Sequence, residues 1–348
     1  MFSMNIYIMK RFIRKYFTHN RPEPLIRLFR KKMSFEYKLS SFGNRNKKLI
    51  FYVIKRNIGS GFFSNLFFVL NHIRVAEKFN FIPVIDMKNF KTIYNENSKN
   101  YKNKNFWEVY FKKITKYELK DVYKSNNVVF SGNSLPSDTV FDWNKNNLRK
   151  IYQKYIKINK KFLSKKNNFV KKNFKQKILG VHFRGTSYKI ARSHSLQPNL
   201  KIMTNLINSL IKKYNYKKIF LITEELAYFD SLKNEFKDKL IFYESYRSYK
   251  DDAFKNYPRK NHRYKLGEEI LIETLILSEC HGLISNTTNV EKAARFISQK
   301  KQMIHEIYLG TNSRNKFIAR WLWYLKSFLP EYLGGLKLLT LKSFLKKN

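Results

Sequence analysis

The residues best suited to bind an anionic ligand lie at the end of an apolar run in the middle of the chain. Residues 178–188, ILGVHFRGTSY, contain His182, Arg184, Gly185 and Thr186. Because successive side chains of a strand point to opposite sides, His182 and Arg184 should share one face. A guanidinium there can hold a pyrophosphate through two parallel hydrogen bonds, Gly185 lets the backbone approach the phosphates, and Thr186 adds a hydroxyl. An arginine that only extends into solvent is the alternative.

A glycine turn, GSGFFSN at residues 59–65, precedes a predicted helix and forms the second candidate. The amino end of a helix attracts phosphate, so Gly61 is a candidate for phosphate contact, and Asn65 for a side chain that projects toward a cleft. The turn lacks the lysine of a P-loop, and its glycines do not make G-x-G-x-x-G. A tight turn without a ligand is the alternative.

The third candidate combines a helix with the loop after the next strand. Glu273 is the one acid in the apolar central stretch of residues 268–280, and a buried carboxylate needs a donor. Guanine offers its N1–H and 2-amino groups, which match the two oxygens of a carboxylate. In the run SNTTN, Thr287 and Thr288 can cap the following helix while its free N–H groups face an anion; ordinary capping is the alternative.

Several common catalytic motifs are missing from the sequence. It contains no Asp-x-Asp for a divalent cation, no His/Cys cluster with zinc spacing and no G-x-S-x-G, and its seven histidines are scattered. The residues therefore favour a mechanism without a metal that relies on arginine.

The pattern of the second half predicts a mostly parallel sheet with helices on both faces and its ligand at the carboxyl ends of the strands. A β-α-β unit is predicted near the start of the organised sequence, from a strand at 48–55, a helix at 64–79 and a strand at 81–87. Further on, strands 177–183, 217–223, 239–244, 281–286 and 302–307 alternate with helices 199–215, 224–236, 267–280 and 289–298.

Composition limits the kinds of partner and the cellular compartment that fit this chain. The formal net charge of +45 attracts anions in general, but lysine-rich composition alone is weak evidence for a nucleic-acid partner. The single cysteine, Cys280, excludes an intramolecular disulfide and fits a reducing compartment. No apolar run approaches the roughly 20 residues that span a bilayer, and basic residues from Lys10 onward interrupt the start too early for a secretory signal. A cytoplasmic protein is expected.

The glycine turn, the strand end with Arg184 and the acid-bearing helix with its following threonines occur in an order that resembles the fucosyltransferase superfamily. This superfamily includes core α-1,6-fucosyltransferases, nodulation fucosyltransferases, α-1,2-fucosyltransferases and protein O-fucosyltransferases. The resemblance covers about residues 50–305, and its counterparts are GFFSNLFFVLNHIRVAEKF, GVHFRGTSY, LITEEL and LIETLILSECHGLISNTTNVEKAARFI. It implies an α/β, GT-B-like fold of two Rossmann-type domains facing a cleft, with GDP-fucose held mainly by the second domain and no metal.

Carried over position by position, the resemblance assigns roles within the three candidates. Arg184 would bind the β-phosphate and stabilise the leaving group, and His182 would contact the nucleotide. Glu273 would read guanine, Thr288 would hydrogen-bond a phosphate, and the Gly61 turn would face the pyrophosphate from the opposite domain.

The sequence departs from the family in ways that leave the general base unassigned. The second arginine of the family motif is Gly185 here, its aspartate is Ser187, and the carboxylate proposed as base in one branch falls near Arg192. Glu224 and Glu225 stand where the family often has two aspartates. The possible helpers for proton transfer are Glu224, Glu225 and His194.

The last 37 residues or so, from 312 to 348, alternate aromatic and leucine residues with lysine and arginine, with breaks at Pro330 and at Gly334–Gly335. The pattern predicts two short basic amphipathic helices that lie on an anionic membrane surface, and packing back onto the protein is the alternative. The expected organisation is a basic arm (1–45), an acceptor-side Rossmann-like domain (46–175), a nucleotide-sugar-binding domain (176–311) and these helices.

The function predicted is a metal-independent glycosyltransferase that moves fucose from GDP-fucose to a glycan or glycolipid acceptor, in the cytoplasm and peripheral on the inner face of a membrane. One alternative is a basic nucleic-acid-binding protein, which the lack of helix-turn-helix, zinc-finger, RRM or KH patterns and the spread of the basic residues disfavour. The other is an inactive glycosyltransferase fold that binds glycan.

Overall fold

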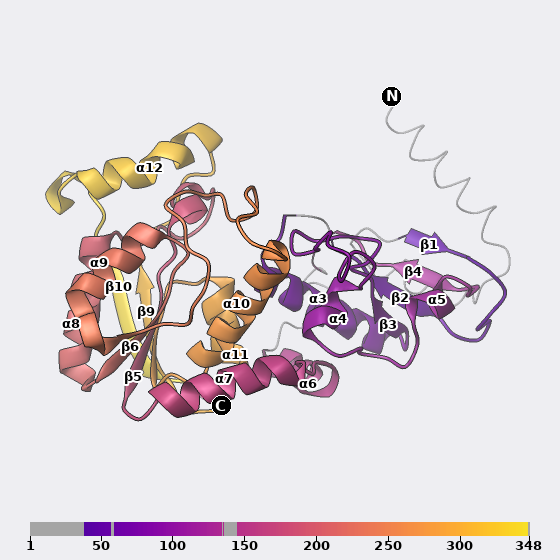
Figure 1. Ribbon diagram of the computed structural model, residues 1–348. Helices are drawn as coiled ribbons and strands as arrows, with labels where there is room; N and C mark the ends of the chain where they lie inside the picture. Colours follow the sequence, from indigo (N-terminus) through magenta and orange to yellow (C-terminus); the bar gives the residue numbers. More distant parts are fainter. Residues whose placement is uncertain (1–37, 57–58, 134, 136–144, 347–348) are drawn as a thin grey trace, which may run out of the picture. The chain divides into compact units, whose positions relative to one another are not determined.

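The structure is a computed structural model, and it describes residues 38–56, 59–133, 135 and 145–346 (Figure 1). They form two compact units. The first is drawn from the segments up to Gly59, 65–92 and 104–157, and the second from 60–64, 93–103 and 158 onward. Each unit is built on its own sheet.

The first unit contains the predicted β-α-β arrangement. Strands β2 (Phe51–Ile54) and β3 (Ile82–Ile85) are parallel and are joined by α3 (Phe62–Lys78). The sheet has the order β1-β4-β2-β3, in which β4 (Val128–Phe130) is parallel to β2 and the edge strand β1 (Lys38–Ser40) is antiparallel to β4. The remaining helices of this unit are α4 (Phe106–Tyr110), α5 (Leu119–Val122) and α6 (Lys145–Tyr155).

The second unit has a sheet of order β10-β9-β8-β5-β6-β7. The five strands β9, β8, β5, β6 and β7 run parallel to one another, and the edge strand β10 is antiparallel to β9. All five strands predicted from residue 177 onward are present. They are β5 (Ile178–His182), β6 (Lys218–Ile222), β7 (Leu240–Ile241), β8 (Gly282–Ser285) and β9 (Met303–Tyr308). A further strand, β10 (Thr340–Leu345), was not predicted.

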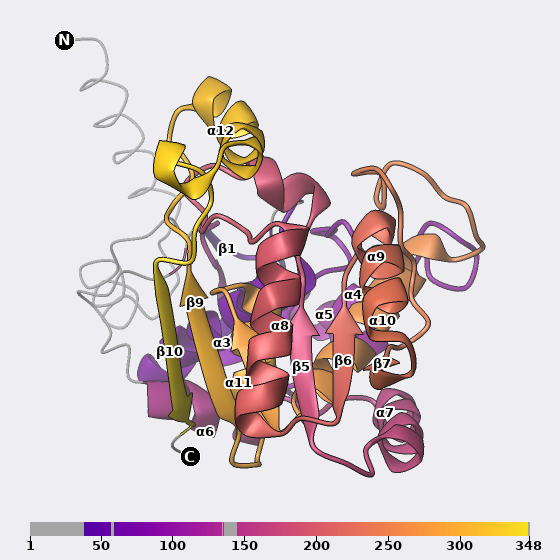
Figure 2. The same cartoon turned by 90° about the vertical axis from the view of Figure 1, so that its left-hand side faces the viewer.

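Helices cover both faces of this sheet, as the alternating pattern predicted. Figure 2 shows α8 and α9 in front of the sheet and α10 and α11 behind it. The helices and 3₁₀ turns are α7 (Lys160–Asn173), η1 (Thr186–Ile190), α8 (Leu200–Tyr214), α9 (Leu226–Phe236), η2 (Lys237–Lys239), α10 (His262–Leu277), α11 (Asn289–Ile297), α12 (Lys316–Phe328) and η3 (Glu331–Leu333). Helix α7 packs on α10 and belongs to the second unit, although the sequence suggested that it completes the first.

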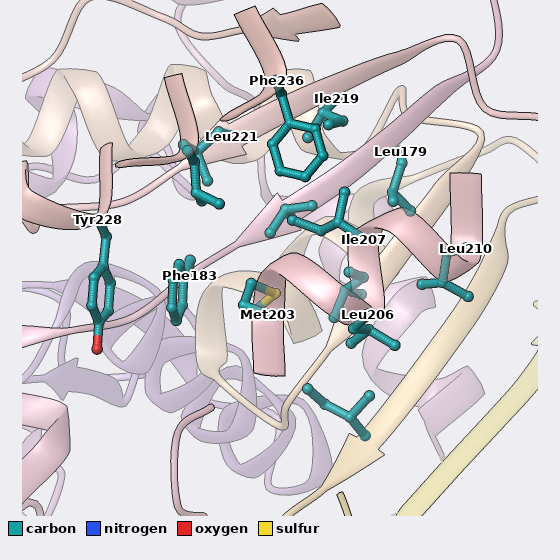
Figure 3. Close-up of a cluster of buried hydrophobic side chains, with 14 of the residues drawn as sticks. Leu179, Phe183, Met203, Leu206, Ile207, Leu210, Ile219, Leu221, Tyr228 and Phe236 are labelled. Atoms are coloured by element: carbon teal, nitrogen blue, oxygen red, sulfur yellow. The ribbon is translucent and has the colours of Figure 1, made fainter. Parts of the chain in front are cut away.

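The two faces of β5 pack differently because side chains alternate along it. Leu179 and Val181 join the apolar core beneath α8 and α9 (Figure 3). On the other face, a Cβ atom at Gly180 would lie 2.6 Å from Leu277 Cδ1 and 3.1 Å from Cys280 Sγ, so the glycine lets the end of α10 approach the sheet closely. His182 follows on this second face.

The C-terminal segment corrects one prediction. The first expected helix forms as α12, but the second does not, since residues 340–345 form β10 and pair with the full length of β9. The chain reverses at Gly334, whose φ of 84° suits glycine, and at Gly335, where a Cβ atom would lie 2.0 Å from the Leu329 carbonyl oxygen. Pairing with β10 satisfies backbone N–H and C=O groups along the otherwise open edge of β9.

None of the helices within the described residues is long and apolar enough to cross a membrane.

The two tryptophans of α12 provide a direct test of how this segment packs. Trp323 is buried and its indole N–H donates to the Gln197 carbonyl oxygen at 2.8 Å, whereas Trp321 is 62% exposed. We expect Trp323→Ala to lower the free energy of unfolding by about 3–5 kcal/mol and Trp321→Ala to change it by less than about 0.5 kcal/mol. Urea unfolding followed by circular dichroism measures both, and equal losses would contradict this packing.

Candidate functional site

Arg184 lies just beyond the carboxyl end of β5, where a parallel sheet of this kind binds its ligand. Its guanidinium carbon lies 4.4 Å from the centre of the Tyr188 ring, and its Nε lies 3.5 Å from Glu224 Oε1. Nε is buried without a hydrogen-bond partner among the described residues, while the side chain as a whole is 24% exposed. The guanidinium thus lies beside a carboxylate and an aromatic ring, and part of the side chain remains accessible.

Two carboxylates after β6 hold the loop that carries Arg184. Glu224 Oε1 accepts hydrogen bonds from the Gly185 N–H at 3.1 Å and the Thr186 hydroxyl at 3.2 Å. Glu225 accepts from the Thr186 N–H at 2.9 Å and from Lys189 Nζ at 2.7 Å. We call these contacts the carboxylate clamp. Glu224 and Glu225, predicted as possible proton-transfer helpers, are therefore occupied in positioning this loop.

The clamp explains two unusual features of the loop backbone. Thr186 has a φ of 33°, which a β-branched residue rarely adopts, and both its N–H and its hydroxyl are bonded to the clamp. A Cβ atom at position 185 would lie 1.8 Å from Glu225 Oε2, so only glycine leaves room for that carboxylate. The sequence analysis assigned the glycine to phosphate approach, and the structure adds this second reason for it.

Charge within the clamp favours the ionised form of Glu224. Burial opposes the charge, but the neighbouring Arg184 guanidinium and His182 favour it, and the net effect holds the pKa of the Glu224 carboxyl below its usual value. A stable negative charge behind Arg184 keeps the guanidinium oriented at neutral pH.

His182 is buried and contacts the start of α11. Its Nδ1 lies 3.0 Å from the Thr288 hydroxyl and 3.4 Å from Glu291 Oε1. Thr288 is the N-cap of α11 and forms a capping box with Glu291, in which the Glu291 N–H donates to the threonine hydroxyl at 3.3 Å and the Thr288 N–H donates to Oε2 at 3.1 Å. Ordinary capping, the alternative left open for Thr288, is thus present, with His182 attached to it.

Glu291 is a site residue that the sequence analysis missed. Besides Thr288, it accepts from the Asn286 N–H at 2.7 Å and so organises the whole turn between β8 and α11. The pattern T-x-x-E at 288–291 is a capping-box signature and could have identified it. Thr287, in contrast, is exposed, has a φ of 63° and shares a 2.8 Å hydrogen bond with the Ser195 hydroxyl.

Glu273 lies buried on α10 and meets a donor, as its apolar surroundings predicted. The Ser245 hydroxyl donates to its Oε1 at 2.7 Å. Burial raises the pKa of Glu273 to about 8, although Ser245 and the charge of Arg247 pull the pKa down. Burial therefore favours the protonated form of Glu273.

The Gly61 turn is tied to an aromatic residue that the sequence did not single out. The N–H of Phe62 donates to the Tyr94 hydroxyl at 3.1 Å, and the Tyr94 ring contacts Phe254 with centroids 5.2 Å apart. These contacts group residues 60–64 with the second unit, whereas the resemblance placed the turn in the opposite domain. Burial raises the pKa of Tyr94 to about 12, against the opposing charge of Arg184.

Asn65 and His194 have distinct surroundings. Asn65 is buried in the first unit and its Oδ1 accepts from Arg56 Nε at 3.4 Å. His194 is exposed, its Nδ1 lies 2.7 Å from the Arg192 carbonyl oxygen, and its ring contacts that of Tyr188 with centroids 5.3 Å apart. Because a carbonyl oxygen can only accept, Nδ1 must carry the proton, which leaves Nε2 of the neutral ring able to accept one.

An aromatic cavity of about 590 Å³ lies in the first unit. No motif pointed to it, because its walls come from residues scattered over ninety positions. They are Ser40, Phe42, Lys55, Asn89, Phe90, Tyr123 and Phe130.

Within the described residues, no three His, Cys, Asp or Glu side chains are grouped so that they could hold a metal ion.

Two α/β units, each with parallel strands joined through helices, give the chain a GT-B-like α/β fold. The fucosyltransferase NodZ from Bradyrhizobium is similar over 75% of this chain and 95% of its own, with a TM-score of 0.50 and 14% identity. An α-1,6-fucosyltransferase NodZ structure with GDP matches 74% of this chain and 94% of its own (TM-score 0.49, 15% identity), and POFUT1 with GDP matches 71% and 94% (0.43, 9%). No family model and no curated protein matches the chain.

The buried proton on Glu273 predicts a pH-dependent stability. Between its ordinary pKa of 4.5 and about 8, the unfolded chain loses this proton while the folded chain keeps it, so rising pH favours unfolding across that range. We expect Glu273→Gln to gain stability over the wild type between pH 5 and 8, on the order of a few kcal/mol. Urea titrations at several pH values measure this difference.

Glu279 provides a control of opposite sign. Burial opposes its charge, but ion pairs with Lys166 and Lys300 outweigh burial and lower the pKa of Glu279. Glu279→Gln should therefore cost stability at pH 7 and lose that effect in acid. If the free energy of unfolding changes with pH in the same way for the wild type and for Glu273→Gln, Glu273 is ionised in the folded chain and the prediction is wrong.

Proposed function

We propose that the chain is a glycosyltransferase that transfers fucose from GDP-fucose to a glycan or lipid-linked glycan, without a metal. The observation that carries the proposal is Arg184, which lies beyond the carboxyl end of β5, with its Nε 3.5 Å from Glu224 Oε1 and its side chain 24% exposed, on a loop held by the carboxylate clamp. The fold shared with the fucosyltransferase NodZ from Bradyrhizobium supports it, as does the order of the sequence motifs.

Arg184 supplies the electrostatic part of the reaction. Departure of GDP leaves negative charge on the β-phosphate and positive charge on the sugar, and a fixed guanidinium stabilises the charge that develops on the leaving group. Because Glu224 and Tyr188 orient the side chain beforehand, little reorganisation is needed when the bond breaks. Thr186 and the start of α11 lie beside this position in the proposal and face the phosphates.

His182, Thr288 and Glu273 take different parts in nucleotide binding. His182 and Thr288 are both buried and bonded to each other, so we assign His182 to positioning of the α11 turn rather than to direct contact. For guanine, an ionised Glu273 would accept from N1–H and the 2-amino group, which requires release of the proton that burial holds there at neutral pH.

For the general base, the geometry favours His194 over the two glutamates. Glu224 and Glu225 each accept two hydrogen bonds from the Arg184 loop, whereas the Nε2 atom of His194 is available for a proton. A weak base suffices, because the acceptor hydroxyl attacks a carbon that already carries positive charge. The aromatic cavity of the first unit is our candidate for the acceptor sugar, since its volume lies within the range of small-molecule sites.

The nucleotide assignment is tested by calorimetry in EDTA with GDP, ADP and UDP. GDP should bind, and Arg184→Ala should weaken binding by well over tenfold, because a charge-assisted hydrogen bond contributes about 1.5–3 kcal/mol. Arg320→Ala, which removes an exposed arginine of α12, should leave GDP affinity unchanged. Preference for UDP, or a strict need for Mn²⁺, would overturn the assignment, and salt-sensitive DNA binding without GDP binding would favour a nucleic-acid-binding protein.

The base is tested through slow hydrolysis of GDP-fucose, with water as acceptor. His194→Gln should reduce the rate of GDP release by about 10²-fold or more, the usual contribution of a general base. Its affinity for GDP should remain that of the wild type. Unchanged hydrolysis would exclude His194, and a loss of GDP affinity would mean that it binds the donor instead.

A further inference from the structure

One side of α12 exposes a continuous row of large apolar side chains. Phe317, Trp321, Tyr324 and Phe328 follow at intervals of four, three and four residues, which places them on one face of the helix. Their exposures range from 47% for Tyr324 to 88% for Phe328. We call these four residues the apolar face of α12. Ile318, Leu325, Tyr332 and Leu333 are exposed beside or beyond it.

The opposite side of α12 is firmly attached to the second unit. Ala319 and Trp323 are buried, and Nδ2 of the buried Asn312 donates to the Ala319 carbonyl oxygen at 3.1 Å. Asn315 caps the first turn by accepting from the Phe317 and Ile318 N–H groups. The apolar face therefore belongs to a well-packed helix, and its exposure is a property of the folded unit. Soluble proteins rarely expose a row of this size without a partner.

Charge around the apolar face indicates the kind of partner. Residues 312–346 contain seven lysines and arginines and one acid, Glu331. Lys316 and Arg320 are exposed on the helix, and Arg314 is exposed just before its N-cap. An aromatic and aliphatic face flanked by cations matches the interface of an anionic bilayer, where rings sit among the head groups and cations meet phosphates. A second copy of a chain with net charge +45 is a poorer match, because like charges repel.

We propose that the apolar face of α12 inserts into the interfacial layer of an anionic membrane and orients the second unit on it. Figure 2 shows α12 beyond the carboxyl ends of the parallel strands, where Arg184 also lies. The link between them is short, since Lys189 Nζ lies 4.9 Å from the centre of the Trp323 ring and bonds to the clamp residue Glu225. The membrane therefore lies on the side of the donor site.

This placement also narrows the acceptor, in a step that rests on the proposed function. An enzyme held with its donor site beside the head groups meets acceptors that are anchored in the same membrane. A glycan attached to a lipid is therefore favoured over a free oligosaccharide.

The test places a reporter on the apolar face of the full-length chain. Phe328→Cys is labelled with a polarity-sensitive fluorophore, which is selective because Cys280, the one native cysteine, is buried. Tyr257→Cys, 54% exposed on a loop of the same unit, is the matched control. With phosphatidylglycerol vesicles we expect a blue shift at position 328 and none at 257, and with phosphatidylcholine vesicles a much weaker shift.

A second variant separates this face from other basic parts of the chain. Trp321→Ser with Phe328→Ser should reduce co-sedimentation with the anionic vesicles at least about tenfold, because two of the four rings that enter the interfacial layer are removed. Undiminished binding, or binding without a shift at position 328, would overturn the proposal. A shift at 328 that appears without vesicles and grows with protein concentration would also overturn it, in favour of self-association.

GDP calorimetry on the same samples keeps the two proposals apart. Vesicle insertion without GDP binding would support the membrane face and reject the glycosyltransferase function. GDP binding without insertion would do the reverse.

Discussion

The candidate site depends on one set of contacts, the carboxylates of Glu224 and Glu225 against the loop that follows β5. They satisfy the backbone N–H groups of Gly185 and Thr186, hold Thr186 at a positive φ and fix the Arg184 guanidinium from behind. Backbone N–H groups with no regular partner would otherwise carry an energetic cost when buried. By accepting hydrogen bonds from these groups, the two acids hold the loop that carries the partly exposed Arg184.

Neighbouring parts of the second unit extend this support in two directions. On the face of the sheet covered by α10 and α11, His182 connects the end of β5 to the capping box of α11, so the loops that follow β5 and β8 are held together. Beyond the strands, Lys189 links Glu225 to Trp323 and thereby to α12. The loop after β5 therefore contacts both the proposed donor site and the helix that carries the proposed membrane face.

Much of the second unit was predictable because its signals are local. The apolar runs, the alternation of strand and helix, the glycine in the loop after β5 and the threonine cap of α11 are each contained within a few residues. The first unit was harder, since β1 and β4 have three residues each and lie in a polar, lysine-rich background. The prediction for the C-terminal segment was partly wrong, because β10 is stabilised by pairing with the edge of β9 and its own sequence has only a weak strand pattern.

The sequence by itself determined the α/β class, the order of most elements and the strong positive charge, and it predicted Arg184 as the leading anion-binding residue. The tertiary structure decided what surrounds that arginine. Glu224 and Glu225 hold the loop, Tyr94 meets the Gly61 turn, and Glu273 keeps its proton, because each depends on which strand or helix becomes a neighbour in space. The physical reason is that helix caps and side-chain periods act over a few residues, whereas hydrogen-bond partners and burial are set by packing between segments distant in the chain.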